Sequence, residues 1–184
     1  MLFDLTNVEA AAQDFKILGP DVFANISSLG LSSKRGFEIT GLSSQFSYTT
    51  QQMTLKNMKL QTSQSTLFGD IIMNYSANGY SDFVNTVVFT ASFTPSRIAT
   101  NDLYGFYDEF GPNQTIGFKG NLKGVLNDFS FTKAAITTSN TKLAGDYYFK
   151  DILKGATAFN IHFKNHDITT VSYTHLTLPT KDSV

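Results

Sequence analysis

The chain has 184 residues, of which 41 % are hydrophobic, 14 % aromatic and only 16 % charged, and its formal net charge is −1. This near-neutral charge excludes the strongly positive net charge that marks most nucleic-acid-binding domains. The chain contains no Cys, which excludes a disulfide framework and thiolate chemistry.

The beginning of the chain, MLFDLTNVEAAAQDF, lacks the basic region and apolar core of a secretory signal. No stretch of sequence approaches the roughly 20 consecutive apolar residues of a membrane-spanning helix. Either the protein is cytosolic, or its targeting segment and membrane anchor lie outside this chain. We expect the second, with Met1 an internal methionine of a longer protein.

Apolar and polar residues alternate with a period of two along most of the chain. Phe89, Ala91 and Phe93, for example, alternate with Thr90 and Ser92. Side chains at i and i+2 point to the same side of a strand, so each segment has one apolar face and one Ser/Thr/Lys face. This pattern predicts an antiparallel sheet covered on one side only. It recurs over residues 37–48, 53–56, 87–94, 116–122, 129–131 and 159–163.

Turn signals lie between these segments. They predict about ten strands of roughly 6–12 residues. One short helix is expected over residues 101–110, capped by Asn101 and ended by Gly111-Pro112. Residues 81–84 and 151–153 are expected to form single helical turns. The turn signals are at 19–20, 34–36, 78–79, 111–113 and 127–128.

The chain contains an internal repeat. TSQSTLFGD at 62–70 matches TSNTKLAGD at 138–146, an offset of 138 − 62 = 76 residues that also places Gly41 on Gly117. Looser copies are visible at 3–11 and 161–170. Such repetition indicates an elongated, stacked β architecture, the alternative being an accidental match of Ser/Thr-rich segments. Asp70 and Asp146 recur with the repeat, which predicts that they bond to backbone at a strand entry rather than take part in catalysis.

The repeated segments resemble a known family. The stretches GFEITGLSSQFSYTTQQMTLKNMKLQTSQSTLFGDIIMNYS, NDLYGFYDEFGPNQTIGFKGNLKGVLNDFSF and TKLAGDYYFKDI are similar to the TamB proteins, the translocation and assembly module of Gram-negative envelopes. They resemble AsmA-like proteins more loosely. The resemblance covers Leu2 to Thr170.

The resemblance implies a periplasmic, non-enzymatic β-groove that is anchored to the inner membrane by a helix absent here. In that family the groove is thought to carry phospholipid between the two membranes or to assist outer-membrane protein assembly. The implied partners are phospholipid acyl chains and an outer-membrane assembly protein of the Omp85 type. No cofactor, metal or nucleic acid is implied.

The residues themselves support a groove, because a one-sided sheet must cover its apolar face. It can close on itself, dimerise, or curl into an open trough that holds acyl chains, where each buried methylene contributes roughly 0.8 kcal/mol. An ordinary dry core is the alternative at each position. The residues predicted to line the groove are Phe46, Leu55, Leu67, Phe89, Phe93, Phe118, Leu122, Phe131 and Phe149.

Residues 171–184, VSYTHLTLPTKDSV, depart from the repeat. VSYTHLTLPT can be translated from GTC TCT TAT ACA CAT CTG ACG CTG CCG ACG, which resembles the transposon end of a sequencing library. Thr170, Lys181 and Val184 fit the neighbouring adapter bases. We therefore expect two parts: a segment of the repetitive β-groove at 1–170 and a non-native, adapter-derived tail at 171–184. Native codons in the nucleotide read would contradict this prediction.

Other chemistry has little support in the sequence. On a strand His162 and His166 would lie about 13 Å apart, too far to share one metal ion. No Walker, Rossmann or G-x-S-x-G motif is present. The second functional class left open is a closed β-sandwich that binds a glycan or acts as an adhesin. Its candidate contact residues are Tyr104, Tyr107 and Asp108.

Overall fold

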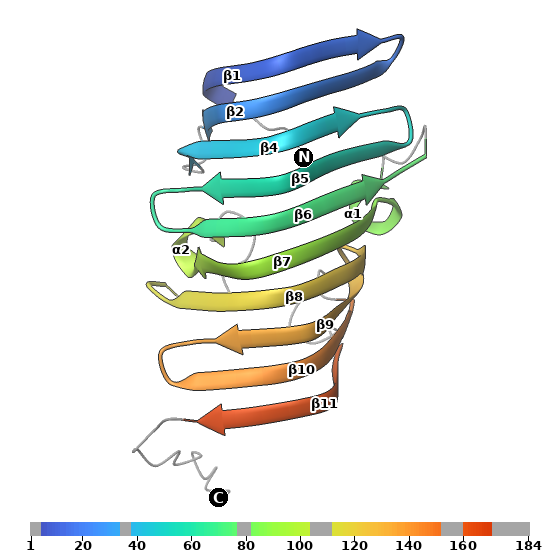
Figure 1. Cartoon of the computed structure of the whole chain (residues 1–184). Coiled ribbons are helices and arrows are strands. Elements are labelled where there is room, and N and C mark those ends of the chain that lie inside the picture. Colours follow the sequence, from blue (N-terminus) through green and yellow to red (C-terminus); the bar gives the residue numbers. More distant parts are fainter. Residues whose placement is uncertain (1–4, 34–37, 77–81, 104–111, 152–159, 171–184) are drawn as a thin grey trace, which may run out of the picture.

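The computed structural model describes residues 5–33, 38–76, 82–103, 112–151 and 160–170. In these residues the chain forms one open antiparallel sheet, in which ten strands follow one another in chain order (Figure 1). A further strand of two residues, β3, pairs with β2. The mainly β, antiparallel prediction is confirmed. The strands are β1 (Leu5–Leu18), β2 (Asp21–Ser33), β3 (Glu38–Ile39), β4 (Gly41–Tyr48), β5 (Gln52–Gln61), β6 (Thr66–Asn74), β7 (Val88–Ala99), β8 (Thr115–Val125), β9 (Asp128–Thr137), β10 (Thr141–Lys150) and β11 (Asn160–Thr170).

Two short helices flank β7. Helix α1 (Phe83–Thr86) precedes this strand and α2 (Thr100–Leu103) follows it, so the two lie at opposite ends of the strands (Figure 1). Helix α1 corresponds to the helical turn predicted at 81–84, and α2 begins one residue before the predicted cap. The predicted continuation to residue 110, and residues 152–153 of the third predicted turn, lie outside the described residues.

The 76-residue repeat is a repeat of structure. Gly41 pairs with Gln61 between β4 and β5, and Gly117 pairs with Thr137 between β8 and β9. Each residue pair that joins β4 to β5 recurs 76 residues later between β8 and β9. The same holds for β5 with β6 and β9 with β10. The three-strand units β4–β6 and β8–β10 are thus two copies in one register, which excludes an accidental match.

Asp70 and Asp146 have the predicted structural role. The backbone N–H of Asn57 donates to Asp70 Oδ1 at 2.7 Å, and that of Lys133 donates to Asp146 Oδ1 at 2.8 Å. Asn57 and Lys133 are equivalent residues with φ of 51° and 49°, each in a β-bulge. The carboxylate therefore satisfies the N–H group of a bulged residue on the neighbouring strand. Asp70 and Asp146 lie in the middle of β6 and β10, not at the predicted strand entry.

Replacing Asp146 with alanine is expected to reduce the free energy of unfolding by about 2 kcal/mol, because the Lys133 N–H loses a charge-assisted bond. Urea denaturation followed by circular dichroism would measure the change. Asp128→Ala is the matched control, since this side chain is exposed and makes no hydrogen bond within the described part of the chain. Equal losses in both variants would contradict the assigned role.

Bulges recur in every strand pairing from β4 to β11. Register shifts interrupt eight of the strand pairings described. Gly69, Gly120 and Gly145 lie at these shifts with φ of 151°, 145° and 149°, a conformation that side chains other than glycine rarely adopt. A bulge bends its strand and increases the local twist. Bulges in the successive pairings from β4 to β11 therefore favour a bend that crosses these strands.

Candidate functional site

The nine residues predicted to line a groove lie on one face of the sheet. Phe46 pairs with Leu55 and Leu122 pairs with Phe131, and residues paired across antiparallel strands project to the same side. Phe89 and Phe93 share this side on β7. Phe131 is buried and the other eight side chains are half-buried. We call this side the apolar face.

Two rows of apolar residues cross the apolar face from β2 to β10, each row containing one residue from each strand. The register joins neighbours within a row without a break. The first row consists of Val22, Tyr48, Met53, Met73, Phe89, Gly124, Phe129 and Phe149. The second row consists of Ala24, Phe46, Leu55, Ile71, Ala91, Leu122, Phe131 and Tyr147.

Because of the bulges, the apolar face contains residues that strict alternation would not place there. After Leu55, alternation would place Asn57 and Lys59 on the apolar face. The bulge at Asn57 shifts the pattern by one residue, and Met58 lies on that face instead with 2 % of its surface exposed. Ala134, its equivalent in the second copy, is 3 % exposed. The signal for both was present in the sequence, as an apolar step of three residues instead of two.

Aromatic rings pack against one another on this face. Phe93 and Phe118 meet edge to face with centroids 5.3 Å apart, and Phe118 meets Phe131 at 6.4 Å. Phe129 and Phe149 stack at 4.7 Å. Such geometries are the ones that aromatic quadrupoles favour. Phe131, Ala134 and Tyr147 form the buried centre of this cluster, and burial raises the pKa of the Tyr147 phenol through desolvation.

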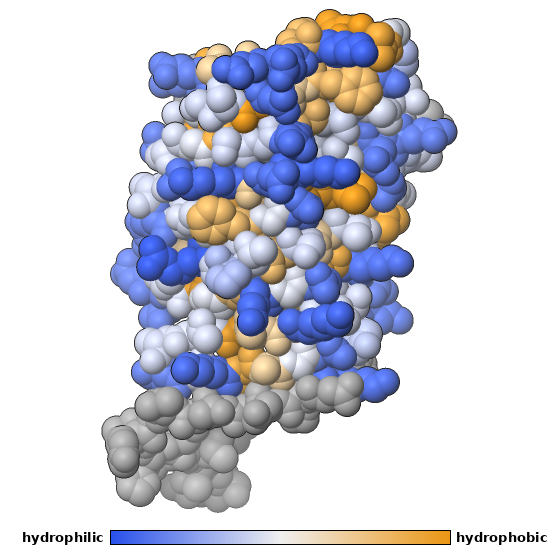
Figure 2. Space-filling model, in the orientation of Figure 1, coloured by the Kyte–Doolittle hydropathy of each residue, from blue (hydrophilic) through white to orange (hydrophobic). Residues whose placement is uncertain are grey.

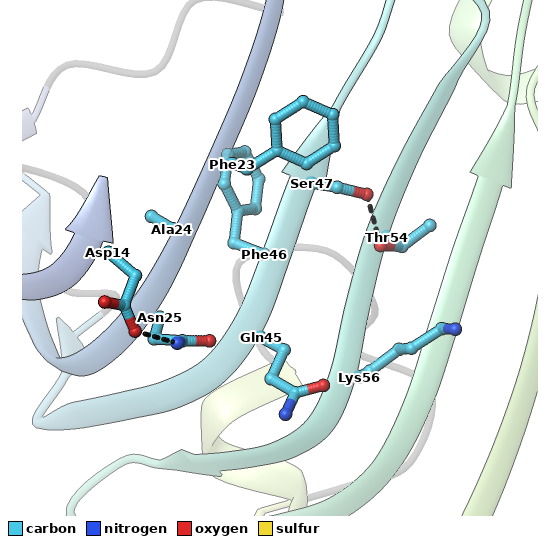
Figure 3. Close-up of a pocket in the computed structure, with 9 residues that line it drawn as sticks. All are labelled: Asp14, Phe23, Ala24, Asn25, Gln45, Phe46, Ser47, Thr54 and Lys56. Carbon is cyan, nitrogen blue, oxygen red and sulfur yellow. Dashed lines mark hydrogen bonds between the residues drawn. The ribbon is translucent and has the colours of Figure 1, made fainter. Parts of the chain in front are cut away.

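The opposite face of the sheet is polar. Ser47 pairs with Thr54 and their hydroxyls are hydrogen-bonded at 2.6 Å. Asn25 donates to Asp14 Oδ2 at 2.7 Å. Together with neighbouring side chains these groups surround a shallow depression of about 380 Å³ on β1, β2, β4 and β5 (Figure 3). Its lining is Asp14, Phe23, Ala24, Asn25, Gln45, Phe46, Ser47, Thr54 and Lys56.

A network of hydroxyl groups holds α2 against the turn between β5 and β6. Thr62 donates to Asp102 Oδ2 at 2.6 Å, and Ser65 donates to the same oxygen. The backbone N–H of Ala99 donates in turn to the Ser65 hydroxyl at 2.9 Å. Ser65 is 2 % exposed, so its hydroxyl depends on these partners. The network therefore acts as a structural support for the end of β7.

The first strand presents apolar residues to solvent. Phe15 is 63 % exposed and Ile17 is 59 % exposed, because β1 has a neighbour on one side only. Figure 2 shows hydrophobic residues at this edge of the sheet, over β1. The rest of the side in view is mixed, with hydrophilic and hydrophobic residues interspersed (Figure 2).

Some predicted features fall outside the residues that the structure describes. These are Tyr104, Tyr107 and Asp108 of the alternative binding module, and the tail at 171–184. Among the residues that are described, no group of three or more His, Cys, Asp or Glu side chains could hold a metal ion. None of the helices there is long and apolar enough to span a membrane.

Comparison with known proteins gives no relative. No protein-family model, no curated protein and no solved structure matches the chain.

Proposed function

We propose that this chain is part of a TamB- or AsmA-like envelope protein and that its apolar face is the lining of an open groove for phospholipid acyl chains. The observation that carries the proposal is the pair of apolar rows that cross the sheet from β2 to β10 without a polar interruption. The groove has no catalytic role. It acts in the periplasm, in phospholipid transport between the membranes or in outer-membrane protein assembly with an Omp85-type partner.

The line of bulges supports a trough instead of a flat sheet. Gly69, Gly120 and Gly145 remove side chains at the level of the bend. A sheet bent there toward its apolar face would bring the aromatic rings on the two sides of the bend closer together. Acyl chains lying along that bend would cover the half-buried rings, and each methylene removed from water would contribute roughly 0.8 kcal/mol.

The alternative, a closed β-sandwich that binds a glycan, has less support. A sandwich needs two packed sheets, with side chains of both inner faces interdigitating. The strands within the described ranges belong to one sheet, whose order follows the chain. Among the described residues, the depression of Figure 3 is the feature that would favour a glycan. Its lining combines polar side chains such as Asp14, Asn25 and Lys56 with Ala24 and Phe46 of the second apolar row.

Site-specific photocrosslinking tests the proposal. The photoreactive residue benzoylphenylalanine would replace Phe93 on the apolar face or Thr90 on the polar face of the same strand. We expect phospholipid adducts at position 93 and none at 90 when the chain is illuminated in the periplasm of a Gram-negative cell. Mass spectrometry of the purified chain would identify the adducts.

A second test of the same proposal introduces a charge into the groove. Phe46→Glu is expected to remove most co-purified phospholipid, whereas Ser47→Glu, one residue away on the other face, leaves it unchanged. Equal adducts at positions 90 and 93, or equal lipid content in the two glutamate variants, would refute the groove.

A further inference from the structure

The polar faces of the two structural copies carry different charges. The unit β8–β10 has lysines at five positions, each equivalent to a neutral residue in β4–β6. The first unit contains two lysines and one aspartate, and the second contains five lysines and two aspartates. The lysine face, as we call it, consists of Lys119, Lys123, Lys133, Lys142 and Lys150. The equivalent residues of the first copy are Ser43, Ser47, Asn57, Thr66 and Asn74.

All five lysine side chains are exposed. In the part of the chain that the structure describes, none of their ammonium groups has a hydrogen-bond or ion-pair partner. Asp146 lies on the same face, but its carboxylate already accepts the N–H of Lys133. Asp128 is the register partner of Lys150 and is the second aspartate of the unit β8–β10. Arg97 on β7 pairs with Gly117 and extends the positive surface by one strand.

The arrangement of these charges indicates the kind of partner. Lys119 and Lys123 lie about 13 Å apart along β8, and the lysines of β10 are two strands away, about 10 Å across the sheet. Ammonium groups spread in this way do not converge on one compact anion. They suit a flat surface that carries many single negative charges. Tyr148, 41 % exposed, lies within the lysine face and adds the kind of amphipathic ring that is enriched at membrane–water interfaces.

We propose that the lysine face docks on the surface of a bilayer that contains anionic phospholipid headgroups. The positive face and the negative headgroups attract each other while the apolar face points away from the bilayer. The inference uses the opposite side of the sheet from the acyl groove and does not rest on it. The two lysines of the first copy, Lys56 and Lys59, provide a control with the same change of net charge.

Vesicle co-sedimentation of the full chain tests this docking. The measured quantity is the ratio of two affinities, one for vesicles of equimolar phosphatidylcholine and phosphatidylglycerol and one for vesicles of pure phosphatidylcholine. We call this ratio the gain. Hydrophobic adsorption contributes to both affinities and therefore cancels. Replacing Lys119 and Lys123 with serine, the residue of the first copy, is expected to lower that gain about 30-fold, at roughly fivefold per lysine near an anionic surface. The gain should also fall with added salt.

The control variant replaces Lys56 with threonine and Lys59 with alanine, which are the residues of the second copy. It loses the same two charges and should keep nearly all of the gain. Equal losses in both variants, or no gain in the unaltered chain, would overturn the proposal. So would tighter binding to polyglutamate than to anionic vesicles, which would assign the face to an acidic protein. Acyl photocrosslinking at Phe93 is scored separately, so the groove and the lysine face can fail independently.

Discussion

Replacing Gly69 with alanine is expected to destabilise the fold by about 3 kcal/mol, because the new side chain meets both backbone strain and a steric clash. Gly69 has a φ of 151°. A Cβ atom built there would overlap the carbonyl oxygen of Ser92 and lie 3.0 Å from the Cα of Phe93. Both atoms belong to the backbone of β7, which cannot move aside without breaking its pairing. Urea denaturation followed by circular dichroism would give the change in free energy of unfolding.

Gly41→Ala is the matched control for this experiment. Gly41 is also in a strand, but a Cβ atom at this position would have the Gln61 side-chain oxygen as its nearest neighbour, at 3.8 Å, which is an ordinary contact. Its substitution should change the free energy of unfolding by less than about 1 kcal/mol. If alanine is tolerated equally at both positions, the bend in the sheet does not depend on glycine at Gly69.

Replacing Phe131 with alanine should cost about 3 kcal/mol, the lower end of the range for a buried phenylalanine, because a single sheet can relax more than a two-layer core. Phe131 is 8 % exposed and its ring contacts that of Phe118. Its register partners are Leu122 and Tyr147, so the truncation opens a gap in the middle of the second apolar row. Thermal and urea unfolding of the Phe131→Ala variant and of the unaltered chain would measure the loss.

Phe68→Ala is the appropriate comparison, since Phe68 is a strand residue of the same type and is 36 % exposed. We expect a loss below about 1 kcal/mol there, as for most surface substitutions. A loss at Phe131 no larger than that at Phe68 would mean that the aromatic cluster does not stabilise the sheet.

Much of the architecture could be predicted from the sequence, because period-two alternation and the 76-residue repeat are both direct consequences of strand geometry. Met53 and Leu55 indicated a strand with one apolar face, and the structure has β5 at that place. The repeat also predicted which residues are equivalent, and the register of Gly41 and Gly117 confirms it. The strand order was not predicted from the sequence; the structure shows that the long strands follow one another in chain order.

The bulges were the main feature that alternation could not supply. A bulge changes which residues face the same side. Part of what stabilises it comes from residues that are distant in the sequence. The N–H of Asn57 is satisfied by Asp70 from the next strand, so the local pattern around Asn57 does not contain its explanation. Lys133 and Asp146 are likewise 13 residues apart in the sequence, as Asn57 and Asp70 are. In both copies only the pairing of two strands reveals why the residue can adopt a positive φ.

The hydroxyl network around Asp102 was not predicted either. It joins Thr62 and Ser65 to a residue on α2 that is about 40 positions away in the chain. Neither hydroxyl is unusual in a sequence so rich in Ser and Thr. A polar contact of this kind depends on how α2 closes against the end of the sheet, which no local pattern specifies.

The strictly sequential order of the strands has a consequence for how the protein folds. In the described sheet the ten long strands pair in chain order, and the two-residue β3 pairs with β2 beside them. Each pairing therefore closes a loop between consecutive long strands, the longest at residues 75–87 and 100–114. Growth can begin at any hairpin and proceed in both directions. Damage in one three-strand unit should lower the cooperativity of unfolding without preventing the other unit from forming. Such a chain can lengthen in evolution by duplicating units, since each new unit needs to match only its immediate neighbour.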